Sequence, residues 1–205
     1  MQAIRTDGVK VELHDDGTWT PVDAVAKPKT GTLEASASGF RGVSWGSPSE
    51  MAIAREGRKA DQTVENALIW AGVSLADLSW TAAYIFVDNQ LARGKYLLET
   101  EYHNENRYLL EFQRLLDLLE QKYGQPTEKQ DVWLGDLYQD TPDEWGMAVS
   151  TGDLTRLARW TLASSEVYLG LSGENFETKL VIEYSNPVLA GEEERRKTGE
   201  SLSDL

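Results

Sequence analysis

The chain has 205 residues, of which 40% are hydrophobic and 26% charged, as is typical of a globular protein with one main domain. Its net charge of −14 at neutral pH repels phosphate backbones and anionic membrane surfaces, which excludes general nucleic-acid binding. Cysteine is absent, which excludes disulfides and thiol chemistry, and no apolar run reaches the roughly 18 residues of a membrane-spanning helix, so we expect no membrane insertion.

Residues 1–22 predict a small N-terminal β-ribbon. Apolar and polar side chains alternate over residues 9–13, as in a half-buried strand. Asp-Gly pairs at 7–8 and 16–17 are typical of hairpin turns. Residues 23–39 are small, polar and aperiodic, and therefore predict a linker.

The main domain is predicted over residues 40–190. Its first helix is expected to start with a capping box, in which Ser47 is the N-cap, Pro48 the first helical residue and Glu50 the third residue after the cap. Gly57 is expected to end this helix.

Residues 67–73 predict a short apolar strand, and residues 80–87 form the strongest predicted strand. Its two faces are both apolar, so we expect it to be central in the sheet and covered on both sides. Asp88-Asn89-Gln90 predicts a turn into a partner strand over residues 91–102.

A long helix is predicted from Asn104 to Tyr123. Its apolar residues recur at helical spacing, which indicates one buried face, and Gly124 and Pro126 favour an end directly after it. The apolar stripe consists of Tyr108, Phe112, Leu115, Leu116, Leu119 and Tyr123.

Further strands are predicted after this helix, followed by a charged tail over residues 191–205. We therefore predict an α+β fold, in which a mainly antiparallel sheet of about six or seven strands packs one face against the long helix. The predicted late strands are 132–134, 154–161, 166–172 and 176–185.

The region between the strand at 132–134 and the next one mixes aromatic and acidic residues. Exposed tryptophans can stack on sugars or anchor a peptide, so this region is the candidate binding surface. The competing interpretation is that the aromatics close the edge of the core while the acids solvate a loop and cap a helix. The candidate binding residues are Trp133, Asp136, Tyr138, Asp143 and Trp145.

No motif predicts catalytic residues, a metal site or a cofactor. The two histidines, His14 and His103, lie on different predicted modules, whereas hydrolase triads and histidine metal sites need converging partners. The acids at 136–144 lack the spacing of an EF-hand. Neither a Walker loop nor a dinucleotide fingerprint occurs.

Four stretches occur in an order that resembles an uncharacterised family of apparently exported bacterial α+β proteins. They are FRGVSWGS at 40–47, YIFVDNQL at 84–91, LLEQKYGQP at 118–126 and EWGMAVS at 144–150. The N-terminal ribbon is similar to ribbons found just after bacterial export signals. The resemblance implies a periplasmic or extracellular location after removal of a leader, with the cytoplasm as the alternative, and it implies no catalytic residues.

Three classes of function remain open. The first is a non-enzymatic binding or interaction module of the cell envelope, with a protein or glycan partner. The second is a carboxylate-dependent hydrolase of glycan or peptide, which needs two facing acids from 136–144, or one of them with Glu99 or Glu101. The third is an acidic inhibitor or immunity-type protein that blocks a basic partner.

Overall fold

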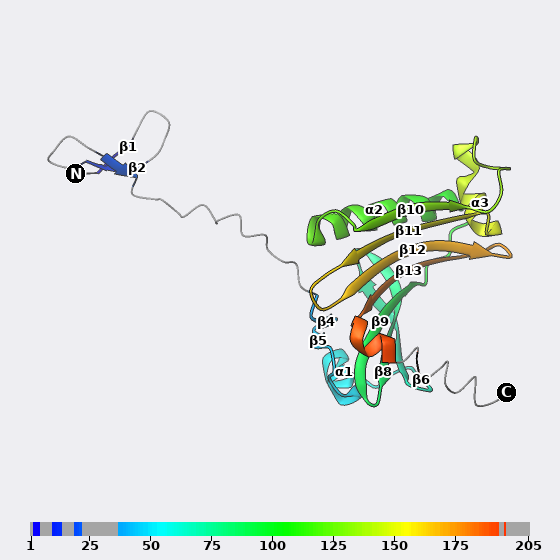
Figure 1. Ribbon diagram of the computed structural model, residues 1–205, viewed down its shortest axis with the longest axis horizontal. Coiled ribbons are helices and arrows are strands. Elements are labelled where there is room, and N and C mark those ends of the chain that lie inside the picture. Colours follow the sequence, from blue (N-terminus) through cyan, green and yellow to red (C-terminus); the bar gives the residue numbers. More distant parts are fainter. Residues whose placement is uncertain (1, 5–9, 14–18, 22–36, 193–194, 196–205) are drawn as a thin grey trace. The chain divides into compact units, whose positions relative to one another are not determined.

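The computed structural model describes residues 2–4, 10–13, 19–21, 37–192 and 195, and divides the chain into two compact units, 1–33 and 34–205 (Figure 1). The predicted turns at 7–8 and 16–17, His14, most of the predicted linker and most of the predicted tail lie outside the described residues. Each unit is described by itself.

The smaller unit contains an antiparallel three-stranded sheet, which confirms the predicted ribbon. Strand β2 is central and pairs with β1 through Ala3↔Val11 and with β3 through Glu12↔Thr20. The strands are β1 (Gln2–Ile4), β2 (Lys10–Leu13) and β3 (Trp19–Pro21).

The larger unit is built on one sheet of eight strands, and every neighbouring pair is antiparallel, which confirms the predicted α+β class. In spatial order the strands are β10 (Glu128–Trp133), β11 (Leu154–Thr161), β12 (Glu166–Glu174), β13 (Glu177–Ser185), β9 (Gln90–Leu98), β8 (Leu78–Val87), β7 (Ala67–Leu75) and β6 (Gln62–Val64). The strand that the sequence did not predict is β6. All three of its side chains are exposed, so its sequence lacks the alternation of apolar and polar residues that predicts a half-buried strand.

Two four-stranded meanders make up this sheet. Strands β6 to β9 form the first and β10 to β13 the second, and their last strands meet in the middle through pairs such as Leu97↔Val181 and Lys95↔Glu183. Each meander follows a helix in the chain, α1 (Ser49–Glu56) and α2 (Asn106–Tyr123). A 3₁₀ turn η1 (Pro142–Glu144) and the helix α3 (Trp145–Thr151) connect β10 to β11.

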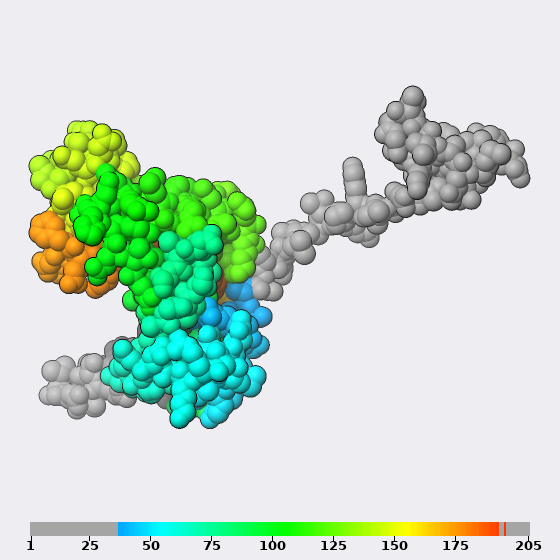
Figure 2. Space-filling view, turned by 180° about the vertical axis from the view of Figure 1, so that it is seen from behind, coloured from blue at the N-terminus to red at the C-terminus, as the bar shows by residue number. Residues whose placement is uncertain are grey.

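Helix α2 buries the predicted stripe against the second meander. Tyr108, Phe112 and Leu116 are buried, and Tyr123 is partly buried, in the same core cluster as strands β11, β12 and β13. Figure 2 shows the residues of α1 (cyan) and α2 (green) at opposite ends of the larger unit. The prediction of a long helix that covers the sheet is therefore confirmed.

Strand β8 is covered completely on one face only. Trp80, Ala82, Tyr84 and Phe86 are buried in the core that the helices cover. On the opposite face Thr81 and Ile85 remain partly exposed, although Ala83 and Val87 are buried. The expectation of complete cover on both faces is thus correct only in part.

The start of α1 differs from the predicted capping box. Pro48 is the N-cap residue and the helix begins at Ser49, with no side-chain cap from its own segment. The backbone of Ser47 is engaged elsewhere, because its carbonyl accepts a hydrogen bond of 2.8 Å from the Leu91 amide. The Oδ1 of Asn89, in the β8–β9 turn, accepts the Ser49 amide at 3.0 Å instead. The predicted end is confirmed, since Gly57 adopts the left-handed conformation.

The stretch 40–47 packs α1 onto the sheet. It contains a two-stranded ribbon of β4 (Gly39–Phe40) and β5 (Val43–Ser44). The buried ring of Phe40 lies on Gly94 of β9, so closely that a Cβ at position 94 would sit 2.0 Å from the ring. Trp45 Nε1 donates to Ser165 Oγ at 2.7 Å. Packing against the sheet therefore accounts for the aromatic residues of this stretch.

Candidate binding surface

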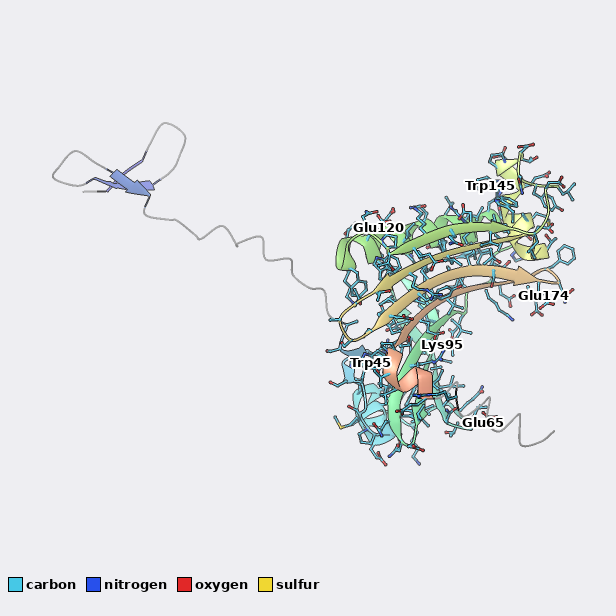
Figure 3. All side chains as sticks on the ribbon, viewed as in Figure 1. Trp45, Glu65, Lys95, Glu120, Trp145 and Glu174 are labelled. Atoms are coloured by element: carbon cyan, nitrogen blue, oxygen red, sulfur yellow. The ribbon has the colours of Figure 1, made fainter. Side chains whose placement is uncertain are left out.

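The predicted tryptophans lie together where β10 ends. Figure 3 labels Trp145 near this end of the sheet. Trp133 is the last residue of β10 and Trp145 the first of α3, and their ring centroids are 5.6 Å apart in an edge-to-face arrangement. Both rings are partly buried against the core, and Trp145 Nε1 donates to the Gln139 carbonyl at 3.2 Å. Through this hydrogen bond, Trp145 fixes the middle of the intervening loop.

The other predicted site residues lie on the same loop. Tyr138 is partly buried against the core, whereas Asp136 and Asp143 are exposed. Neither of these carboxylates pairs with a described side chain, and both backbone carbonyls accept hydrogen bonds within the region. The structure thus brings the five predicted residues into one segment, and their binding role stays a prediction.

Two exposed leucines on this loop are not among the residues predicted from the sequence. Leu134 is 82% exposed and Leu137 is 73% exposed. Leu134 falls within the predicted strand 132–134, and no prediction covers Leu137. The only available signal was their position among acidic residues, which is typical of a loop.

The loop that carries the leucines is fixed by hydrogen bonds. Its first residue is held by Leu134 N to Asp153 O at 2.8 Å, and Gln139 Nε2 donates to Gly135 O at 3.0 Å. Inside the loop, Thr141 N donates to Tyr138 O at 3.0 Å. The leucines therefore stand on a preformed surface.

Asn106, in the first turn of α2, holds the far end of the loop. Its Nδ2 donates to the Asp143 carbonyl at 2.6 Å, and its Oδ1 accepts the Gly146 amide at 2.8 Å. Gly146 is buried, and a Cβ there would lie 2.4 Å from the Asn106 amide nitrogen. Only glycine allows this close approach of helix and loop.

The charge of this region is entirely negative. Between Lys129 and Arg156 the sequence contains no lysine or arginine. The acids in this interval are Asp131, Asp136, Asp140, Asp143, Glu144 and Asp153. Arg156, which follows, is paired with Asp131 at 2.8 Å. The exposed leucines are thus flanked along the chain by acids, with no lysine or arginine between Lys129 and Arg156.

Glu99, a candidate acid in the hydrolase alternative, is held as a carboxylate. Hydrogen bonds from Ser79 Oγ at 2.6 Å, the Gly72 amide at 2.9 Å and Thr81 Oγ1 at 2.8 Å lower its pKa below the usual value. A general acid needs the opposite shift. Among residues 37–192 and the other described residues, no three His, Asp or Glu side chains are grouped as a metal would require.

A second set of polar groups is buried between α1 and the sheet. Burial alone would raise the pKa of Glu56, but hydrogen bonds from Arg41 and from the Tyr84 hydroxyl outweigh it and lower the pKa. Burial and the hydrogen bond to Glu56 raise the pKa of Tyr84. These groups satisfy one another, which is the arrangement of a structural cluster.

Comparison with known proteins identifies no relative: no family model, curated protein or solved structure matches this chain. In the described part of the chain, none of the helices combines the length and the hydropathy needed to cross a membrane.

Proposed function

We propose that this protein is a non-enzymatic interaction module, and that the loop at 134–144 binds a partner protein with a basic surface. The observation that carries the proposal is the exposure of Leu134 and Leu137 on a loop fixed by hydrogen bonds. A setting in the cell envelope is part of this proposal and comes from the sequence resemblance alone, since no comparison matches the chain.

Burial of these leucines can supply the affinity. Each fully buried leucine side chain contributes about 1.5–3 kcal/mol. Because the loop is already ordered, a partner loses little of this free energy to loop ordering. Trp145, which packs edge to face on Trp133, holds the loop through its hydrogen bond to the Gln139 carbonyl.

The surrounding acids define the chemistry of the partner. Asp136, Asp140, Asp143 and Glu144 are exposed around the leucines. They favour a partner whose apolar centre is bordered by lysine or arginine, and they accelerate its association at low salt. An inhibitor or immunity-type role toward a basic partner is the second candidate, and it uses the same surface.

The hydrolase alternative has less support. Glu99 carries a lowered pKa and is hydrogen-bonded to three donors, which does not suit a general acid. None of the acids in the loop is buried, so none has the apolar surroundings that a general acid needs.

Site-specific photo-crosslinking tests the proposal. A photoreactive residue replaces Leu137 in the full chain, and a matched control carries it at Leu110, which is 70% exposed on α2. We expect a discrete adduct in envelope extract from position 137 and not from 110. The adduct should weaken with added salt and disappear with Leu134→Ser. Equal adducts from both positions would contradict the proposal.

A further inference from the structure

The two central strands of the sheet separate at one end. Strands β13 and β9 pair from Ser185↔Arg93 to Val181↔Leu97. β9 ends at Leu98, whereas β13 extends back to Glu177 and remains paired with β12 over that whole length. Within 37–192, no backbone hydrogen bond joins residues 99–102 to 177–180.

The chain after β9 makes other contacts instead. The Glu99 amide donates to the Ser79 carbonyl of β8 at 3.0 Å, and the Tyr102 amide donates to the Tyr108 hydroxyl at 3.2 Å. A cavity of about 470 Å³ lies between the separated segments, and we call it the β9–β13 cleft. It is lined by residues 98–102, Tyr108 and residues 176–179.

One wall of this cleft is a strand edge. In an antiparallel sheet, alternate residues direct their amide and carbonyl groups to opposite neighbours. Strand β12 satisfies one set of groups over residues 177–180, so the other set faces the cleft. Unpaired strand edges of this kind bind extended peptides by adding a strand.

Phe176 lines the cleft in a backbone conformation that costs free energy. With Asn175 it forms the two-residue turn between Glu174 and Glu177, and its φ is +67°. The left-handed region is unfavourable for a bulky aromatic residue by about 1–2 kcal/mol. The side chain is 72% exposed, so burial does not offset this cost. Such strain indicates a use for the ring at the surface.

We propose that the β9–β13 cleft binds an extended, basic peptide segment of a partner protein, which pairs with residues 177–180 and contacts the Phe176 ring. The cleft is lined by Glu99, Glu101 and Glu177 against the single cation Lys179, so its charge complements lysine or arginine side chains. This site lies outside the loop at 134–144 and does not rest on the function proposed above.

The experiment uses the full chain and a library of short peptides with lysine at alternate positions and varied residues between them. Affinity of the best peptide is measured by fluorescence anisotropy. The same peptide is then N-methylated at alternate residues, which removes the amide donors that strand pairing needs and keeps the charge. We expect N-methylation to weaken binding at least about tenfold, the effect of some 1.4 kcal/mol.

Two variants separate this site from the loop. Phe176→Asn removes the ring but suits the left-handed backbone, and we expect it to weaken binding with no loss of folding. Leu137→Ser should leave peptide binding unchanged. The proposal is overturned if no peptide in the library binds, if the N-methylated peptide binds equally well, or if Phe176→Asn has no effect. Preferential binding of neutral oligosaccharides in the cleft overturns it too.

Discussion

The guanidinium of Arg41 donates to both carboxylate oxygens of Glu56, with Nε 2.7 Å from Oε1 and one terminal nitrogen 3.1 Å from Oε2. The hydroxyl of Tyr84 donates to the same carboxylate at 2.5 Å, and Arg41 also donates to the Tyr96 hydroxyl at 3.3 Å. This pair joins the ribbon of β4 and β5 to the end of α1 and to the core strand β8. Removal of this pair should therefore lower the free energy of unfolding of the whole unit.

Arg41→Met should lower the free energy of unfolding by about 3 kcal/mol, because it leaves the Glu56 carboxylate buried without its cation. Urea denaturation measures the change. The matched control is Arg58→Met, since Arg58 pairs with Asp61 where both side chains are more than 40% exposed. That change should stay within about 0.5 kcal/mol, and an equal loss in both variants would contradict the role given to Arg41.

The same pair predicts a pH dependence. The pKa of Glu56 is lower in the folded chain than its value of 4.5 in the unfolded chain, so folding favours the ionised form. The resulting stability is complete above pH 4.5 and is lost as the pH falls through the folded pKa. In urea denaturation from pH 6 downward, wild type should lose more stability than Glu56→Gln. Parallel curves for the two proteins would rule out this linkage.

Gly94→Ala should destabilise the unit, since its Cβ would meet the ring of Phe40 at 2.0 Å. Overpacking of this kind costs about 1–3 kcal/mol. Thermal denaturation of the variant measures this loss. Combination with Phe40→Leu should recover part of the loss, because the two residues are in contact. Gly191→Ala is the control, as no atom lies within 4 Å of its added Cβ.

Asn106→Ala should loosen the loop that carries the exposed leucines. It leaves the Gly146 amide and the Asp143 carbonyl without their partners, at a cost of about 1–3 kcal/mol. Hydrogen exchange should show faster exchange at the Gly146 amide. The control is Gln113→Ala, which removes an exposed contact with Asp117 on the same helix. Unchanged exchange at Gly146 in Asn106→Ala would refute this role.

Phe176→Asn should raise the free energy of unfolding by about 1 kcal/mol, because asparagine tolerates the left-handed region better than phenylalanine does. Little burial is lost, since the ring is exposed. Thermal denaturation measures the gain in stability. Leu110→Asn, at an exposed position on α2, is the control, because it relieves no left-handed backbone strain. A stability loss in Phe176→Asn would show that the ring contributes packing to the unit.

The sequence predicted those elements whose pattern is local. The stripe from Tyr108 to Tyr123 repeats every three or four residues and marks α2, and strand β11 has the predicted bounds. The cap of α1 was wrong because it comes from Asn89, forty positions along the chain. The exposure of Leu137 and the separation of β9 from β13 depend on tertiary contacts, and a local sequence pattern does not predict such contacts.

The pairing of β9 with β13 also affects how the chain is completed during translation. The first meander leaves the ribosome with β9 as an open edge, and its partner β13 is the last strand among the described residues to be synthesised. Until then the nascent chain presents an unfinished sheet edge that can join with another molecule. Premature stop codons that remove β13 should therefore leave the first meander and an incomplete second half-sheet of β10 to β12, both with open edges that depend on chaperones.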